Sequence, residues 1–478
     1  MSERSVDVAI IGAGTAGLGA RREAEKAGKS YVLIESGPYG TTCARVGCMP
    51  SKLLIAAAEA AHEIKKAPMF GVHPGEIRID GKAVMDRVKR ERDRFVGFVV
   101  AGTERIDAEN RLMGHAKFVS PGVLDVGGHT TVHAKTVVIA TGSAPWVPPP
   151  FSDLGDRVDL NDDVFEWDDL PKSVAVVGTG IIGLELGQAL HRLGVEVAFF
   201  NPFEVLGPFS DDAVKQSVRD VLGAELELHV GIDRDIEAKR VEEGVAISFT
   251  ENGERQTRVF QRVLAAAGRR PNLPGLALEN AGIELDDKGR PVGWRPDTCQ
   301  IGDSSVFMAG DVSGHRPLLH EASDEGHIAG RNAATFPDVQ ADTRRTSLAI
   351  AFTSPQMAIV GKSHEELEPG TFSVGEIDYG DQGRARVMGL NAGLVRIYAN
   401  NADCRIIGAE MFGPRVEHMA QMLANAIHVG ETVSSMLGMP FYHPVVEEGL
   451  RTALRQVGEK LDAVGGCRGQ DTADCPGA

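Results

Sequence analysis

The strongest constraint on the fold is an internal repeat. Residues 6–35 and residues 174–201 each contain an apolar strand, a Gly-x-Gly-x-x-Gly turn, an amphipathic helix and a second apolar strand. In both copies the third glycine of the turn lies 11 residues before the glycine that ends the helix. A single turn of this kind is weak evidence, but two copies with the same internal spacing predict an α/β protein with two Rossmann-like dinucleotide-binding domains.

Size and charge set further limits. The 478 residues suggest three or four domains, at ~100–200 residues each. The formal net charge of −17 disfavours nucleic acid and anionic membranes. No stretch approaches the ~18 apolar residues of a membrane span, and the N-terminus lacks the pattern of a signal peptide. We therefore expect no nucleic-acid partner, no membrane partner and a cytoplasmic location.

The glycine turn and the last residue of the first copy of the repeat are suited to binding FAD. Its glycines permit a tight turn and a close approach of the pyrophosphate, and the helix N-terminus offers N–H groups to the phosphates. A glutamate ends the second strand, where a carboxylate can accept hydrogen bonds from a ribose. An ordinary α/β turn with a surface glutamate is the alternative. The expected FAD-binding residues here and at two later strand ends are Gly12, Gly14, Gly17, Glu35, Ala140, Thr141, Gly142, Gly310 and Asp311.

A pair of cysteines follows this first site. Cys43 and Cys48 are five positions apart, which in a regular helix separates their Cα atoms by about 8.6 Å. A disulfide requires roughly 4.4–6.8 Å, so regular helix cannot run through the segment if the bridge forms. We expect the helix to start near Pro50, which places Cys48 at a helix N-terminus that stabilises a thiolate. Two buried structural thiols or a metal site are the alternatives, but no second Cys or His pair has matching spacing, and no metal is expected.

Residues 40–52, GTTCARVGCMPSK, closely resemble the redox-active segment of the disulfide reductase family that includes dihydrolipoamide dehydrogenase, glutathione reductase and mercuric reductase. The usual Gly-Gly-Thr-Cys of that family appears here as Gly40–Thr41–Thr42–Cys43. The resemblance, which covers nearly the whole chain, implies that Cys43 and Cys48 form the working disulfide. It implies that Cys48 lies next to the flavin and that Cys43 exchanges with the substrate.

The same resemblance implies further residues around the flavin. Lys52 would lie near the flavin N5 and pair with Glu185, because a cation there stabilises reduced flavin and a carboxylate holds the cation. Thr42, and His320 in the segment LLHEASDEG, are also assigned to the cofactor site.

Breaks in the sequence pattern divide the chain. A Pro-rich stretch at 143–150 is interpreted as a linker, and strand-like runs near 394–413 precede a helical pattern at 416–429. The expected parts are an FAD-binding domain with the disulfide at 1–148, an NAD-binding domain at 149–272, a continuation of the FAD-binding region at 273–345, and a C-terminal α+β dimerisation domain at 346–478 with a flexible tail at 464–478.

The second copy of the repeat predicts an NAD site. Its glycines are Gly178, Gly180 and Gly183, and Asn201 stands where the first copy has its glutamate. NADP requires cations for its 2′-phosphate, and no Lys or Arg occurs between Asn201 and Lys215. We therefore expect NAD rather than NADP. Gly268 and Arg269 resemble the strand end that closes this domain in the family.

An acid–base pair is expected near the C-terminus. His443 precedes Pro444 at the expected start of a helix, and Glu448 matches the acid of the family pattern His-Pro-Thr-x-x-Glu, with Val445 in place of the Thr. A dithiol substrate needs a base near neutral pH, and the carboxylate would orient the ring. A capping His-Pro with surface glutamates is the alternative. In this family the pair reaches the disulfide of the other subunit, which implies a homodimer.

The substrate is the least constrained feature. The segment GTGIIGLELG at 178–187 closely resembles dihydrolipoamide dehydrogenases, which implies oxidation of a dihydrolipoyl dithiol, a lipoyl-bearing carrier protein as partner, and transfer of hydride through FAD to NAD. Alternatives are an NAD(P)H-dependent reductase of another disulfide of the glutathione type or of mercuric ion, and a flavoprotein retained as a binding component of a multienzyme complex. Arg21–Arg22 on the first helix and the tail cysteines Cys467 and Cys475 are interpreted as incidental.

Overall fold

The computed structural model describes residues 2–463 and divides the chain into two compact units. The first unit comprises the chain up to Leu53, Asp86–Trp146 and Gly268–Arg344. The second comprises Leu54–Met85, Val147–Ala267 and the chain from Arg345 onward. The helices α3 (Cys48–Lys66) and α4 (Gly81–Glu104) each contain a boundary between the units.

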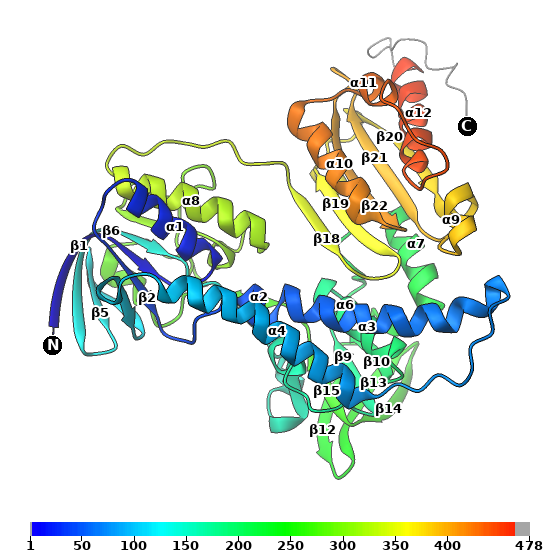
Figure 1. Cartoon of the computed structure of the whole chain (residues 1–478), viewed down its shortest axis with the longest axis horizontal. Helices are drawn as coiled ribbons and strands as arrows, with labels where there is room; N and C mark the ends of the chain where they lie inside the picture. The colour runs from blue at the N-terminus through cyan, green and yellow to red at the C-terminus, as the bar shows by residue number, and fades with distance from the viewer. Residues whose placement is uncertain (1, 464–478) are drawn as a thin grey trace. The chain divides into compact units, whose positions relative to one another are not determined.

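The first unit is built on a seven-stranded sheet with the order β3-β2-β1-β6-β5-β4, and β17 also pairs with β6. Its central strands are parallel, whereas β4, β5 and β6 are antiparallel. The helices α1 (Thr15–Lys26) and α8 (Leu319–Thr335) lie side by side (Figure 1). The strands are β1 (Ser2–Ile11), β2 (Tyr31–Glu35), β3 (Arg111–Met113), β4 (Ala116–Ser120), β5 (Val123–Val126), β6 (Thr130–Ile139) and β17 (Val306–Met308).

The strand register gathers the predicted flavin residues at one edge of this sheet. Ile11 pairs with Ile34 of β2 and with Ile139 of β6, and Ile139 pairs with Met308 of β17. The residues that follow these strands therefore meet at the carboxyl ends of parallel strands, where open α/β sheets bind ligands. The apolar run of β1 supports this placement, because alternate residues of the strand enter two separate cores on the two faces of the sheet.

The second unit contains the second nucleotide fold. Five parallel strands have the order β11-β10-β9-β15-β8, and a three-stranded antiparallel sheet β12-β13-β14 accompanies them. The helices are α5 (Asn161–Val164), α6 (Ile181–Arg192) and α7 (Asp212–Gly223), and the strands are β8 (Val158–Leu160), β9 (Ser173–Val177), β10 (Glu196–Asn201), β11 (Glu227–Val230), β12 (Glu237–Val241), β13 (Gly244–Glu251), β14 (Glu254–Phe260) and β15 (Arg262–Ala265).

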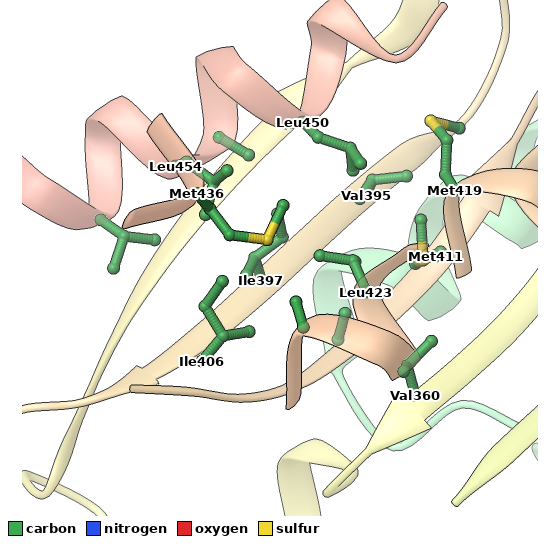
Figure 2. Close-up of a cluster of buried hydrophobic side chains, with 14 of the residues drawn as sticks. Val360, Val395, Ile397, Ile406, Met411, Met419, Leu423, Met436, Leu450 and Leu454 are labelled. Atoms are coloured by element: carbon green, nitrogen blue, oxygen red, sulfur yellow. The ribbon is translucent and has the colours of Figure 1, made fainter. Parts of the chain in front are cut away.

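The same unit ends in the predicted α+β domain. An antiparallel sheet of order β18-β19-β22-β21-β20 packs through one face against α10 and α12, and Figure 2 shows apolar side chains from both layers meeting in this core. The strands are β18 (Leu348–Ala351), β19 (Gln356–Gly361), β20 (Phe372–Asp378), β21 (Leu394–Asn400) and β22 (Ile406–Gly413), and the helices are α9 (Gly383–Met388), α10 (Val416–Val429), α11 (Val433–Leu437) and α12 (Glu448–Ala463).

The α/β fold class is confirmed, but the interpretation of residues 143–150 as a linker was wrong in part. Ser143–Pro145 forms strand β7, which pairs antiparallel with β16 (Arg269–Pro271) inside the first unit. The four prolines of residues 143–150 obscured this short strand, because an edge strand tolerates proline but its sequence does not reveal its partner. No helix within residues 2–463 is both long and apolar enough to cross a membrane.

Candidate active site

The first glycine turn has the shape that a pyrophosphate requires. Gly12 has φ +110°, and a Cβ atom there would lie 2.2 Å from the carbonyl oxygen of Ala140. A Cβ on Gly17 would lie 1.8 Å from the oxygen of Gly12, so only glycine allows α1 to approach the sheet this closely. A Cβ on Gly14 would meet no atom within 4 Å. This open space in front of the N-terminus of α1 fits the phosphates of a dinucleotide.

Glu35 is fixed in place beside this turn. Its carboxylate accepts hydrogen bonds from the backbone N–H groups of Ala13 (2.8 Å), Ser36 (2.8 Å) and Gly37 (2.9 Å). Three such donors hold both carboxylate oxygens, and the oxygen that binds Ala13 keeps acceptor capacity for a ribose hydroxyl.

A chain of polar contacts continues along the same edge to Arg269. Ser143 donates to the carboxylate of Asp311 (3.0 Å), and the Arg269 guanidinium donates to the hydroxyl (2.9 Å) and the carbonyl (2.7 Å) of Ser143. The structure thus brings Arg269 to the first nucleotide site, whereas the sequence had grouped it with the second. Thr141 donates to the carbonyl of Asn272 (2.8 Å), and Gly142, which has φ +68°, and Gly268 have open space where a Cβ would lie. His320 is exposed in the first turn of α8.

A buried carboxylate that the sequence analysis missed supports the Gly310–Asp311 turn. Glu325, on α8, accepts a hydrogen bond from the backbone N–H of Gly310 (2.7 Å) and one from Arg344 (3.0 Å). Burial raises the pKa of Glu325, although these two donors oppose the shift. Gly310 has φ +82° and ψ −160°, a conformation that almost only glycine adopts. The hydrogen bond to Glu325 stabilises it. No apolar pattern singles out Glu325 in the sequence, because Glu321 and Asn332 are also buried on this helix.

The two cysteines lie on either side of a break at Gly47. The short helix α2 (Thr42–Val46) ends there, and α3 begins at Cys48. The segment is not one regular helix, as expected, but the start near Pro50 was wrong by two residues. Gly47 has φ −126° and ψ −117°, and a Cβ there would lie 3.2 Å from the Cα of Cys43. The chain turns so tightly at Gly47 that α3 begins at the next residue, Cys48.

The cysteine side chains interact in the dithiol form that the structure presents. Cys43 is half-buried and Cys48 is exposed. A hydrogen bond between the two side chains, together with burial and the nearby charge of Cys48, raises the pKa of the Cys43 thiol. Cys48 lies at the N-terminus of α3, a position at which a helix stabilises a thiolate.

Thr41 carries the departure from the family pattern. Its φ of 55° and ψ of 150° lie in a region that residues other than glycine rarely adopt. Its hydroxyl accepts a weak hydrogen bond from Ala44 (3.4 Å) as the N-cap of α2. The neighbouring Thr42 is exposed as the first residue of α2. The threonine that replaces the second glycine of the family motif therefore has a strained backbone, two residues before Cys43.

Glu185 and Lys52 fall in different units. Glu185 is buried on α6 and accepts a hydrogen bond from the backbone N–H of Phe352 (2.7 Å). Lys52 lies in the second turn of α3. Their pairing near the flavin stays a prediction.

The second glycine turn repeats the first. Gly178 has φ +106°, a Cβ on Gly183 would lie 2.2 Å from the oxygen of Gly178, and a Cβ on Gly180 would meet no atom within 4 Å. Asn201 is only 8 % exposed. Its amide donates to the hydroxyl of Thr179 (2.7 Å), and its oxygen accepts from the backbone N–H of Phe203 (3.1 Å).

Two arginines missed by the sequence argument lie at the end of β10. Arg219 of α7 forms an ion pair with Glu204, and the guanidinium of Arg234 lies 4.9 Å from the centre of the exposed Phe203 ring. The absence of cations between Asn201 and Lys215 is correct for the sequence, but the fold supplies cations from residues further along the chain. This is a correction to the argument from local charge, and it makes Arg234 the residue to test for contact with a 2′-phosphate.

The expected hydrogen bond between His443 and Glu448 is formed. Nδ1 of His443 lies 3.0 Å from one carboxylate oxygen of Glu448, and the other oxygen accepts from the backbone N–H of Val445 (3.0 Å). Burial opposes ionisation, but these hydrogen bonds outweigh it and lower the pKa of Glu448. The helix was expected to start beside His443; α12 starts at Glu448 instead, and the His443 side chain is 75 % exposed on the preceding loop. The tail cysteines Cys467 and Cys475 lie outside the described residues.

Residues 6–326 match the pyridine nucleotide-disulphide oxidoreductase family, and residues 348–454 match its dimerisation domain. The chain belongs to this family. It is 30 % identical to a dihydrolipoyl dehydrogenase of Thermus scotoductus over 94 % of this chain and 97 % of that protein. A dihydrolipoyl dehydrogenase of Bacillus subtilis gives the same identity and coverage.

Solved structures confirm the fold. LpdA from Mycobacterium tuberculosis superposes with a TM-score of 0.80 at 23 % identity, covering 95 % of this chain and 99 % of that one. The flavoprotein disulfide reductase RclA from Escherichia coli gives a TM-score of 0.78 at 22 % identity, covering 95 % and 100 %.

Membership of the family settles the class of reaction and the cofactors. The chain is an oxidoreductase that uses FAD and NAD(P). The two glycine turns fit these dinucleotides, since each leaves open space at a helix N-terminus where a side chain would otherwise lie.

Proposed function

We propose that the enzyme oxidises a dihydrolipoyl dithiol, with NAD as the electron acceptor. The observation that carries the proposal is the hydrogen bond between the Cys43 and Cys48 side chains across the break at Gly47, with Cys48 at the N-terminus of α3. The choice of a dihydrolipoyl substrate rests on the similarity to dihydrolipoyl dehydrogenases over nearly the whole chain.

The residues divide the chemistry between them. One substrate sulfur attacks Sγ of Cys43 in the oxidised enzyme, the Cys43–Cys48 bond breaks, and its electron pair remains on Cys48. His443 accepts the proton of the attacking thiol, and Glu448 stabilises the resulting imidazolium. The second substrate sulfur then attacks the first, which closes the lipoyl disulfide, and Cys43 leaves and takes the second proton. FAD, when bound, supplies the route by which the two electrons on Cys48 reach NAD as hydride.

We infer that the working form is a homodimer in which His443 serves the disulfide of the other subunit. The match to the dimerisation domain and the 75 % exposure of the His443 side chain support this inference. Mixing the inactive variants His443→Ala and Cys43→Ser tests it. Equimolar exchange would make half of the dimers hybrids with one intact site of two, so about a quarter of wild-type activity should return. No recovery after verified exchange would place both groups of a site in one chain.

Comparative turnover tests the substrate and the nucleotide. Dihydrolipoamide with NAD should give the highest kcat/KM, above NADP with the same dithiol and above NADH- or NADPH-driven reduction of glutathione disulfide or mercuric ion. A preference for either of these last two substrates would overturn the dihydrolipoyl assignment. A preference for NADP that Arg234→Ala abolishes would show that the guanidinium of Arg234 binds the 2′-phosphate.

A further inference from the structure

The loop that carries His443 has little structure of its own. Residues 438–447, between α11 and α12, form neither helix nor strand. Tyr442 is 79 % exposed and the His443 side chain is nearly as exposed. A base must nevertheless be held to well under an ångström, because small misplacements of a reacting group lower the rate strongly. Some other part of the domain must therefore fix this backbone.

Glu448 fixes only part of the loop. It binds the His443 ring and the backbone N–H of Val445, both through its own carboxylate at the start of α12. These bonds tie the loop to α12, as does the hydrogen bond from the backbone N–H of Gly449 to the oxygen of Val446 (3.0 Å), but the carbonyl of Val445 is left to be satisfied elsewhere.

Gln382 binds the carbonyl of Val445. Its Nε2 donates to the oxygen of Val445 (3.0 Å). Its Oε1 accepts from the backbone N–H of Ala385 (2.7 Å), which makes Gln382 the N-cap of α9. Because α9 fixes the oxygen end of the amide, the nitrogen end is directed at the loop.

Tyr379 adds a side-chain donor to the carbonyl of Val446. Its hydroxyl lies 3.2 Å from the oxygen of Val446 and 3.1 Å from the sulfur of Met419, and the carbonyl is the stronger acceptor. The ring is fully buried, and burial raises the pKa of Tyr379, so the hydroxyl keeps the proton that it donates.

The packing around Tyr379 indicates a fitted arrangement. A Cβ on Gly449, the residue after Glu448, would lie 2.6 Å from the Tyr379 hydroxyl oxygen. A Cβ on Gly413 would lie 3.2 Å from the edge of the same ring. The hydroxyl therefore reaches the start of α12 only because glycine follows the acid of the His–Glu pair.

We propose that Tyr379 and Gln382 are positioning residues for His443, which hold two consecutive carbonyls of its loop while Glu448 holds the ring. The proposal rests on the assignment of His443 as the base of the proposed function. Both residues act through the backbone between His443 and Glu448.

Two substitutions separate placement from folding. Tyr379→Phe removes only the hydroxyl. Gln382→Glu keeps an oxygen to cap α9 but removes the donor to Val445. Each should lower kcat for dihydrolipoamide oxidation about 3- to 30-fold, less than loss of the base itself. The rate at which NADH reduces the flavin and the KM for NADH should stay within about twofold of wild type, because His443 takes no part in that half-reaction.

Tyr398→Phe is the matched control. Tyr398 is also buried, and its hydroxyl donates to the carboxylate of Asp211 (2.9 Å) rather than to the His443 loop. It should lower Tm at least as much as Tyr379→Phe, since a hydrogen bond to a charged group is the stronger one, yet leave kcat for the dithiol unchanged.

The outcomes separate the two claims. If His443→Ala abolishes dithiol turnover while Tyr379→Phe and Gln382→Glu retain it, the positioning role is wrong and the proposed function stands. If His443→Ala itself retains turnover, the assignment of the base fails and the positioning role fails with it. Should Tyr379→Phe not fold, Gln382→Glu decides alone, because that side chain is only half-buried.

Discussion

A methyl group added at Gly180 tests whether the second glycine turn binds the nicotinamide dinucleotide. Gly180 is the N-cap of α6 with φ −76° and ψ −177°, an extended conformation open to alanine. A Cβ there would meet no protein atom within 4 Å, so the methyl group would occupy only the space that the pyrophosphate needs. Gly180→Ala should therefore damage binding without damaging the fold.

The expected magnitudes follow from this geometry. Alanine gains about 0.4–1 kcal/mol by restricting the unfolded chain. It loses a similar amount because alanine caps a helix poorly, so the net change in the free energy of unfolding should stay within about 0.5 kcal/mol. Displacing the phosphates from one charge-assisted hydrogen bond costs about 1.5–3 kcal/mol, which corresponds to a rise of roughly 10- to 150-fold in the KM for NADH.

Steady-state kinetics, FAD absorbance and denaturant unfolding measure the three quantities. Gly180→Ala should keep its FAD, and Gly14→Ala, with the same open geometry at the first turn, should lose FAD instead. Gly183→Ala is the control for folding, since its Cβ would lie 2.2 Å from the oxygen of Gly178 and should cost about 1–3 kcal/mol or more. A folded Gly180→Ala enzyme with an unchanged KM for NADH would refute the assignment of this turn.

Three further predictions concern the redox centre. His443→Ala should lower dithiol turnover by about 10²–10⁴-fold and leave flavin reduction by NADH nearly intact; equal damage to both half-reactions would contradict a substrate-side base. Cys43→Ser should show a long-wavelength charge-transfer band without reduction and Cys48→Ser should show none, and the reverse pattern would exchange the two thiol roles. Thr41→Gly should raise the free energy of unfolding by about 0.5–2 kcal/mol, because it relieves a backbone strain of about 1–3 kcal/mol and loses only a weak cap. A lower free energy of unfolding in denaturant titrations would show that the Thr41 backbone is not strained.

The sequence by itself determined the features that depend on short stretches of chain. The two glycine turns, the helices behind them and Glu35 follow from spacing within about 30 residues, because a tight turn and a close helix–strand contact require glycine at fixed positions. The break between Cys43 and Cys48 was predictable for the same reason, since helix geometry forbids the bridge.

Only the tertiary structure decided which distant residues support those sites. Arg269 reaches Ser143 and Tyr379 reaches Val446 from elements far away in the chain. The periodicity of a strand or helix tells which residues are buried, but not which buried polar group meets which. Each partner became visible only when the sheets set the register and brought these side chains together.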